Sequence, residues 1–265
     1  ARGRWECTRV HADLKWGRGV AFLFESGSRA GMTTNFYAPP SAFRGQRVVL
    51  PEEESRHVCS VLRAEAGDEI VIVDGEGGWH RVRIDHAAPE QVVGTVQETR
   101  REVGEPAMEV TIGMGMLTKR DRFETFVEKA VELGAARIVP LSTRHTEQTS
   151  VRPDRLRRLM VAAVKQCRRS RVPALAEPKS LDDLLADATA ERRLLCHGGD
   201  GAAPLGSAVE EGGGDDVLLL VGPEGGFAEE EVDRARSAGC VPVELGARRL
   251  RAETAGIAAL TRVLL

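Results

Sequence analysis

The sequence lacks the features that would place the protein in a membrane, in an oxidising compartment or around a structural metal. None of its apolar runs reaches the ~20 residues needed to cross a bilayer, so no membrane partner is expected. Its five cysteines are an odd number and form no C-x-x-C pair, which argues against a disulfide framework and a zinc site. The six histidines show no ligand spacing either. We therefore expect a cytoplasmic protein with reduced thiols and no metal.

A starting methionine is also missing. The chain begins at Ala1, and residues 1–31 are rich in arginine and glycine without a clear periodicity. No long apolar core precedes a small-residue cleavage site, which excludes a signal peptide. Met32 resembles a natural start. We interpret residues 1–31 as a tag or as an upstream extension from a start codon assigned too early, and leave them out of the fold prediction.

Residues 32–100 carry mostly the signals of β-strands. The predicted strands are "RVVL" (47–50), the two halves of "IVIVDGEGGWHRVRI" (70–84), and "QVVGTVQE" (91–98). Among them, "PEEESRHVCSVLRA" (51–64) predicts one short helix whose apolar face is Val58, Val61 and Leu62. The pattern indicates a small, barrel-like β domain.

After a polar stretch the pattern changes to strands that alternate with helices. "TRREVGEPA" (99–107) is typical of a linker, and we place the domain borders at 32–100, 101–107 and 108–265. The later strands are predicted in "MEVTIGMGM", "ARIVPLS", "RRLLCH", "DVLLLVG" and "VPVELG". This alternation predicts an α/β layer with a mostly parallel sheet.

The clearest predicted helix is "DRFETFVEKAVELG" (121–134). Its apolar residues recur with helical spacing at Phe123, Phe126, Val127, Ala130 and Val131. We expect Asp121 and Glu124 to form a capping box at its start, and Gly134 to end it.

"RPDRLRRLMVAAVKQCRRSRVP" (152–173) predicts an amphipathic helix with eight Lys or Arg residues against one Asp. Its apolar face comprises Leu156, Leu159, Met160, Ala163, Val164 and Cys167. Arg158, Lys165 and Arg169 are expected on the opposite face. A basic helix of this kind is often only a solvated surface, but it also suits phosphate contacts. Because the whole chain has a net charge of −3, the concentration of positive charge here favours a polyanion such as RNA.

A glycine-rich turn in "VGPEGGFAEEEVDRARSAG" (221–239) joins a predicted strand to a predicted helix. It has neither the Lys-Ser/Thr of a Walker A loop nor the spacing of a dinucleotide fingerprint. Glu224 lies within the turn, and Glu229–Glu231 fill the first turn of the helix, where they would repel a phosphate. The turn therefore suits a neutral or cationic ligand held by backbone groups.

A second turn of similar design follows in "VELGARRLRAETAGIAAL" (243–260). A strand ends at Leu245–Gly246, arginines follow, and Glu253–Thr254 open an apolar helix. Two parallel strands that end in adjacent loops would build one crevice at their carboxyl ends, with Arg249, Arg251 and Glu253 beside it.

Together, "LLLVGPEGGFAEEEV" and "LGARRLRAETA" resemble the C-terminal motifs of SPOUT methyltransferases. Within that class the chain is most similar to the bacterial ribosomal RNA small subunit methyltransferase E family, the 16S rRNA uridine-N3 methyltransferases. Further matches are "HVCSVLRAEAGDEI", "KRDRFETFVEKAVELGA", "IVPLSTRHTEQ" and "KQCRRSRVP". The resemblance runs from about Tyr37 to Leu265. It departs at Ala228, where many members have Ser or Thr, and at Lys165, Arg168 and Ser170, where many have Glu, Gly and Asn.

The resemblance implies a SPOUT-type α/β domain with a parallel sheet and a deep trefoil knot, preceded by a PUA-like β-barrel that binds RNA. It also implies a homodimer that acts on 16S rRNA or the small ribosomal subunit, with S-adenosyl-L-methionine as cofactor. This cofactor has no phosphate and carries a sulfonium cation, as the acidic turn requires. The implied cofactor-binding residues are Gly222, Pro223, Glu224, Gly225, Gly226, Leu245, Gly246, Leu250, Thr254 and Ala255. The residues expected to contact RNA are Arg63, Lys119, Arg120, Arg122, Lys165, Arg168, Arg169 and Arg171.

Arg251 and Glu253 are the expected catalytic residues. N3 of a uridine carries a proton at neutral pH, so the enzyme has to help it leave. Arg251 is expected to stabilise negative charge on the uracil carbonyl oxygens, while Glu253 either takes the proton or orients Arg251. No covalent nucleophile is needed, so Cys167, Cys196 and Cys240 are expected to serve in packing. Two alternatives stay open: ribose 2′-O-methylation on the same scaffold, and a non-catalytic RNA-binding protein.

Overall fold

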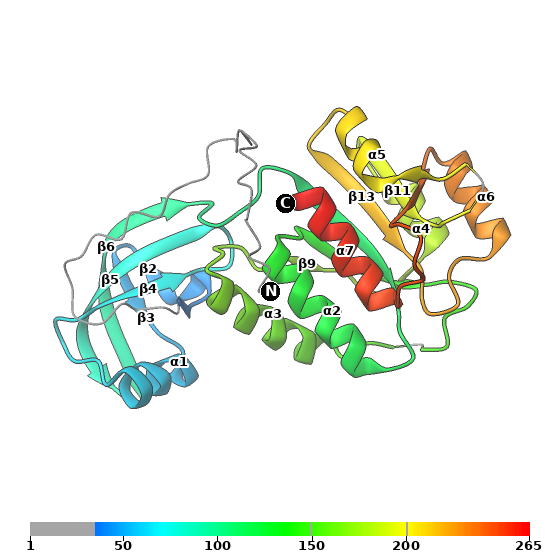
Figure 1. The fold of residues 1–265 in the computed structure, drawn as a ribbon. Helices are drawn as coiled ribbons and strands as arrows, with labels where there is room; N and C mark the ends of the chain where they lie inside the picture. The colour runs from blue at the N-terminus through cyan, green and yellow to red at the C-terminus, as the bar shows by residue number, and fades with distance from the viewer. Residues whose placement is uncertain (1–34, 149, 200) are drawn as a thin grey trace, which may run out of the picture. The chain divides into compact units, whose positions relative to one another are not determined.

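Residues 35–101 form a β domain whose strands surround one core. In the computed structural model, residues 35–148, 150–199 and 201–265 are described, so the interpretation of residues 1–31 lies outside them. The N-terminal β domain (residues 35–101) comprises β1 (Phe36–Tyr37), β2 (Phe43–Arg44), β3 (Arg47–Val49), β4 (Glu69–Val73), β5 (Gly78–Ala88) and β6 (Gln91–Arg101). They form one sheet in the order β1-β4-β5-β6-β3-β2, seen in blue and cyan in Figure 1. Its core contains Phe36, Val48, Ile70, Ile72 and Ile84. The predicted β domain is confirmed.

The helix predicted over residues 51–64 forms, but its second half differs from the prediction. A short 3-10 turn, η1 (Pro40–Ala42), precedes it, and the helix itself consists of α1 (Glu52–His57) and the π-helical turn η2 (Val58–Leu62). Val58 is fully buried, whereas 67% of Val61 and 40% of Leu62 is exposed. The prediction that all three form the buried face is therefore wrong, because the wider π turn rotates the last two away from the core.

The C-terminal α/β domain (residues 108–265) has a parallel sheet, as predicted. Its strands are β7 (Glu109–Gly115), β8 (Arg137–Ser142), β9 (Ala174–Leu175), β10 (Lys179–Ser180), β11 (Arg192–Cys196), β12 (Ala203–Pro204), β13 (Asp216–Val221) and β14 (Val241–Glu244). Their order is β10-β8-β7-β13-β11-β14-β12, with β9 beside β8, and every pair is parallel. All five predicted strands are present, and the short β9, β10 and β12 were not predicted.

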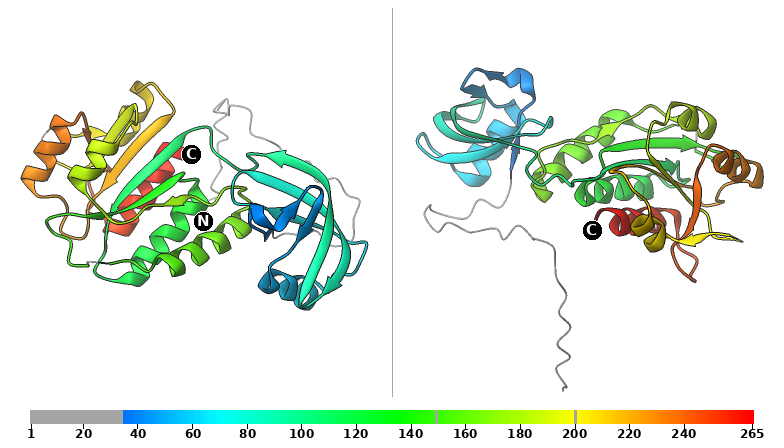
Figure 2. Two further views of the ribbon diagram at one scale, coloured as in Figure 1. Left: turned by 180° about the vertical axis from the view of Figure 1, so that it is seen from behind. Right: turned by 90° about the horizontal axis from the view of Figure 1, so that it is seen from above.

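Helices cover both faces of this sheet. They are α2 (Arg120–Leu133), α3 (Pro153–Cys167), α4 (Leu181–Asp187), α5 (Leu205–Glu211), α6 (Glu229–Ser237) and α7 (Ala252–Leu264). Alternate residues of β13 face the two sides, as the two-residue repeat of a strand requires. Val217, Leu219 and Val221 pack with α2, α3 and α7, whereas Leu218 and Leu220 pack with α4 and α6. Figure 2 shows the two helical layers with the sheet between them.

Helix α2 confirms the predicted apolar face and the predicted end. Its five predicted core residues are all buried, and Gly134 caps the helix with φ = 109°, a left-handed conformation that favours glycine. The predicted capping box is wrong. The helix begins one residue earlier than predicted, with Lys119 at the cap, and Glu124 instead forms a bidentate ion pair with Arg155.

Helix α3 is shorter than the segment predicted for it. It ends at Cys167, and Arg168 adopts a left-handed conformation with φ = 64°. Residues 169–173 therefore lie outside the helix. They include Arg169 and Arg171, two of the arginines predicted to bind RNA.

Candidate active site

The carboxyl ends of the central strands bring five loops to one edge of the sheet. The loops follow β7, β8, β11, β13 and β14, and all of these strands run in the same direction. The two glycine-containing turns singled out in the sequence, after β13 and β14, thus lie at the same edge. However, β11 stands between these two strands and pairs with both, so the turns are not immediate neighbours as predicted.

The loop after β11 is therefore a part of this edge that sequence reasoning missed. It begins at His197, whose N–H donates to the carbonyl of Val243 at 3.1 Å. The signal was present, because "LLCH" is followed by Gly198 and Gly199, the same strand-then-glycine pattern. Burial raises the pKa of the neighbouring Cys196 thiol to about 12, so this sulfur stays protonated and is unsuited to act as a nucleophile.

The turn after β13 is compact, and its glycines make it so. The N–H of Gly226 donates to the carbonyl of Pro223 at 2.9 Å, and Gly226 has φ = 71°. A Cβ on Gly222 would stand 3.0 Å from the backbone of Gly226, a tight contact that favours glycine there. His145, from the loop after β8, lies against the turn, with its Nδ1 3.3 Å from the carbonyl oxygen of Gly226. The glycines thus let a ligand approach the backbone N–H and C=O groups of the turn closely, which suits a ligand without a phosphate.

Two acids of the turn bind the protein's own backbone. Glu224 accepts a hydrogen bond from the N–H of Thr118, after β7, at 3.1 Å. Glu231 is buried and accepts from the N–H groups of Arg144 and Ala228, both at 2.9 Å. Ala228, the helix cap without a polar side chain, is therefore served by the Glu231 carboxylate. Both carboxylates were expected to disfavour phosphate, and Glu224 also to bind the cofactor. In the structure their side chains hold the loops after β7 and β8 in place.

The turn after β14 leads directly to the predicted catalytic residues. Gly246 has φ = 106°, and Arg251 is the exposed cap residue of α7. Leu245, Leu250 and Ala255 are half-buried, while Gly246 and Thr254 are exposed. The residues predicted to bind the cofactor therefore all belong to the two turns or to the first turn of α7.

Glu253 is the least satisfied carboxylate of this region. Its side chain is 13% exposed, and its Oε1 lies 3.7 Å from Nε of Arg122, too far for a hydrogen bond. Its Oε2 is buried and has no hydrogen-bond partner among the described residues. Arg122, predicted to bind RNA, thus faces Glu253, and the ion pair of Glu253 is with Arg122 and not with Arg251. A buried carboxylate oxygen without a partner is unfavourable for folding, and such groups concentrate at functional sites.

The predicted RNA-binding residues differ in exposure and in their partners. Arg63, Lys119 and Arg120 are exposed. Lys165 instead forms an ion pair with Glu54 of α1 at 2.5 Å.

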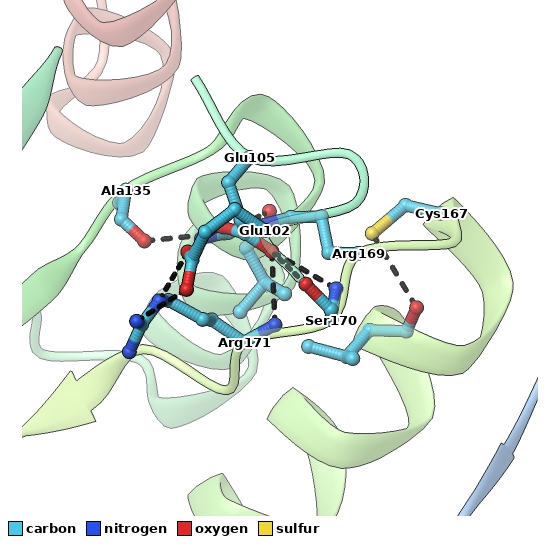
Figure 3. Close-up of polar contacts among 9 residues, drawn as sticks. Glu102, Glu105, Ala135, Cys167, Arg169, Ser170 and Arg171 are labelled. Atoms are coloured by element: carbon cyan, nitrogen blue, oxygen red, sulfur yellow. Dashed lines mark hydrogen bonds and ion pairs between the residues drawn. The ribbon is translucent and has the colours of Figure 1, made fainter. Parts of the chain in front are cut away.

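Arg169 is a structural residue, so the prediction that it lies on an exposed basic face is wrong. It is only 3% exposed. Its guanidinium donates to Glu105 at 2.6 and 3.0 Å and to the carbonyls of Val131 and Ala135 at 2.7 and 3.1 Å. Glu105 also accepts from the N–H groups of Ser170 and Arg171, each at 2.9 Å (Figure 3). A buried arginine with these partners holds residues 102–107 against the end of α3.

Arg171 contacts the same segment, residues 102–107, at the protein surface. It forms a bidentate ion pair with Glu102, and these hydrogen bonds lower the pKa of the Glu102 carboxyl (Figure 3). The main chain on either side bonds to the β4–β5 turn, with the Val172 N–H donating to Gly75 and the Gly77 N–H donating to Ser170. β6 continues to Arg101, so the start of the predicted linker belongs to the strand.

Two other expectations concern absent features. Among residues 35–148, 150–199 and 201–265, no three His, Cys, Asp or Glu side chains come together in a way that could hold a metal ion. Within the same ranges, no helix is both long and apolar enough for a membrane span.

Comparison with known proteins agrees with this architecture. An RNA methyltransferase domain family matches residues 104–264, and an RNA methyltransferase PUA domain family matches residues 50–97. The chain is 30% identical over 249 residues to the ribosomal RNA small subunit methyltransferase E of Synechocystis, covering 90% of this chain and 80% of that protein.

Solved structures show the same fold. A probable rRNA methyltransferase from Porphyromonas gingivalis is 31% identical, with a TM-score of 0.78 over 86% of this chain and 95% of that one. A ribosomal RNA small subunit methyltransferase E from Neisseria gonorrhoeae, bound to S-adenosyl methionine, is 29% identical, with a TM-score of 0.74 over 86% of this chain and 95% of that one.

Proposed function

Because this chain belongs to the ribosomal RNA small subunit methyltransferase E family, we propose that it transfers a methyl group from S-adenosyl-L-methionine to N3 of a uridine in 16S ribosomal RNA. The observation that carries the proposal is the edge where the loops after β11, β13 and β14 meet, with bare glycine backbone at its centre. The same edge is expected to bind the cofactor, since a homologue with this fold contains S-adenosyl methionine.

The turns after β13 and β14 fit this cofactor better than a phosphate-bearing one. Gly222–Gly226 and Leu245–Gly246 offer N–H and C=O groups, and the side chains of Glu224 and Glu231 are directed to backbone N–H groups instead of the ligand. Glu229 and Glu230 stay exposed at the start of α6, where they disfavour a phosphate and favour a cation. S-adenosyl-L-methionine supplies a methyl group on a positively charged sulfur, which suits such surroundings.

We assign the proton transfer to Glu253. Its Oε2 is a buried acceptor without a partner, so it is free to accept the N3–H of a uracil placed beside it. Loss of that proton leaves a lone pair on N3 and negative charge on the two uracil carbonyl oxygens, which Arg251 is positioned to stabilise from the cap of α7. Arg122 lies beside the other oxygen of the Glu253 carboxyl group, with 3.7 Å between its Nε and Oε1.

Assembly and location follow the family in this proposal. We expect a cytoplasmic homodimer that acts on RNA of the small ribosomal subunit. The deep trefoil knot that the family resemblance implies stays a prediction.

Product mapping tests the proposal. Purified protein, labelled S-adenosyl-L-methionine and small subunits from a strain that lacks the gene should yield N3-methyluridine in digested 16S RNA. A 2′-O-methylated nucleoside would contradict the N3 assignment. Absence of label, together with no binding of the cofactor in calorimetry, would point to a non-catalytic RNA-binding protein.

The role of Glu253 has a separate test. Glu253→Gln should lower kcat about 10²- to 10⁴-fold, the usual contribution of a general base, and leave the calorimetric affinity for the cofactor unchanged. Glu253→Asp, which keeps the carboxyl group but withdraws it, should retain an intermediate rate. Equal loss of rate and cofactor affinity in Glu253→Gln would mean that the residue binds the cofactor instead.

A further inference from the structure

The sheet of the N-terminal β domain carries a row of arginines on its outer face. The strand register places Arg83 of β5 opposite Thr95 of β6, Thr95 opposite Arg47 of β3, and Arg47 opposite Arg44 of β2. In the next row, Arg81 of β5 lies opposite Glu98 of β6. We refer to Arg44, Arg47, Arg81 and Arg83 as the arginine row.

Burial shows that these side chains point away from the core. Along β5, His80, Val82 and Ile84 are buried, whereas Arg81 and Arg83 between them are exposed. In β3, Val48 is buried and its neighbour Arg47 is exposed. Since side chains of one strand alternate between the two faces, and directly opposite residues share a face, the whole row lies on the outer side of the sheet.

Arg44 and Arg47 are the unusual members of the row. They form the last cross-strand pair before the two-residue turn at Gly45–Gln46, so two like charges stand directly opposite each other. Such a pair destabilises a hairpin, and neither guanidinium has an acidic partner among the described residues. An arrangement that is unfavourable for the hairpin alone becomes favourable when an anion lies across both arginines.

The acids on this face do not neutralise it. Asp85 lies 3.8 Å from Arg83 and accepts a hydrogen bond from Thr95, and Glu98 contacts both Arg81 and Arg100. Glu69 of β4 is opposite Arg83. These three acids face five arginines, so positive charge remains in excess, and its unpaired part is at the β2–β3 hairpin.

At one end of this face, Trp79 is half-buried and packs against the core of the C-terminal domain, so its ring is not open to a base. Trp79 of β5 lies opposite Arg100 of β6, and the Arg100 guanidinium stands over its ring at 4.9 Å from the centroid. The remaining feature of the face is its exposed arginines, which are typical of surfaces that bind a nucleic-acid backbone through its phosphates.

We propose that the arginine row binds the phosphate backbone of the substrate RNA, with the Arg44–Arg47 pair contacting adjacent phosphates. This inference rests on the proposed function, because it takes RNA as the substrate. The family resemblance already implies that the N-terminal domain binds RNA, and the inference adds which face and which residues make the contact. Lys165, Arg169 and Arg171 at the end of α3 pair with the protein's own acids instead. RNA is favoured over a protein partner because the row is charged and free of exposed large apolar side chains.

The test uses the full chain without cofactor, a fluorescein-labelled fragment of 16S RNA, and anisotropy at several salt concentrations. Arg44→Gln and Arg47→Gln should each weaken binding about five- to tenfold at 0.1 M salt and lower the slope of log Kd against log salt by about one. Arg155→Gln is the matched control, because Arg155 is exposed but forms a bidentate ion pair with Glu124, and it should leave both quantities unchanged.

Arg47→Glu provides the readout that a merely structural role would not give. It turns the repulsive pair into an attractive one, so the melting temperature should rise by ~1–3 °C while RNA affinity falls further than in Arg47→Gln. Unchanged affinity and salt slope in the Arg44 and Arg47 variants would overturn the inference, as would an RNA affinity of the wild-type chain too weak to measure. If RNA binds through this row but no N3-methyluridine forms, the proposed function fails and the inference stands.

Discussion

Two arginine-rich regions of this protein are used in opposite ways. In residues 168–173, which follow α3, Arg169 and Arg171 are bound to Glu105 and Glu102 of the preceding connection between the domains. On the outer face of the N-terminal sheet, Arg44 and Arg47 face each other without an acid. The first region resembles a phosphate-binding segment by its composition, yet Arg169 and Arg171 form ion pairs with acids of the same chain. The difference teaches that the partners of an arginine, and not the number of arginines, distinguish an architectural segment from a binding surface.

The largest effect that separates the two regions is expected at Arg169. Arg169→Ala leaves the Glu105 carboxylate and two backbone carbonyls buried with fewer partners, and should lower the free energy of unfolding by about 3–5 kcal/mol. Urea denaturation followed by circular dichroism measures this change. A loss below about 1 kcal/mol would show that residues 168–173 are less firmly built in than the contacts indicate.

A smaller effect is expected from the backbone of Arg168. Its left-handed conformation is unfavourable for any residue with a Cβ. Arg168→Gly should be about 1 kcal/mol more stable than Arg168→Ala, because both variants lose the side chain and only the first relieves the backbone. Thermal unfolding of the two variants side by side gives the difference. Equal stabilities would mean that the strain is absorbed elsewhere.

The smallest effect is expected at Arg171. Its ion pair with Glu102 is half-exposed, so Arg171→Ala should lower the free energy of unfolding by only ~0.2–1 kcal/mol, and by less at high salt. RNA affinity should stay close to that of the wild type, in contrast to the Arg44 and Arg47 variants. A clear fall in RNA affinity would return this segment to the RNA-binding surface and weaken the comparison.

The sequence was a good guide to elements with a strong repeat and a poor guide to their neighbours. The apolar runs before the glycine turns became β13 and β14, and the helical spacing from Phe123 to Val131 gave the buried face of α2. The order of strands could not be obtained in this way, and β11 between β13 and β14 brings a further loop into the site. The short helices α4 and α5 were missed, although Ser180 caps α4 by accepting from the N–H of Asp183.

The site residues show the same limit. Both turns and the first turn of α7 were predicted by their glycines, charges and family resemblance. The partners of the charged groups were not, since Glu224 bonds to Thr118, 106 residues away, and Arg169 to Glu105, 64 residues away. A sequence pattern describes residues a few positions apart, whereas these contacts depend on how distant segments meet. The same holds for Glu253, which faces Arg122 of α2.

The pairing of β7 with β13 has a consequence for how the protein is made. These strands are adjacent in the sheet but about a hundred residues apart in the chain, and the Thr118–Glu224 bond closes a loop of the same length. Closing such a loop reduces the conformational entropy of the chain before the stabilising contacts form. This step is therefore slow compared with the formation of α2 or α3. During synthesis, the N-terminal β domain and β7 leave the ribosome before β13 exists. The edge proposed to bind the cofactor is therefore completed only after β13 and β14 have been synthesised.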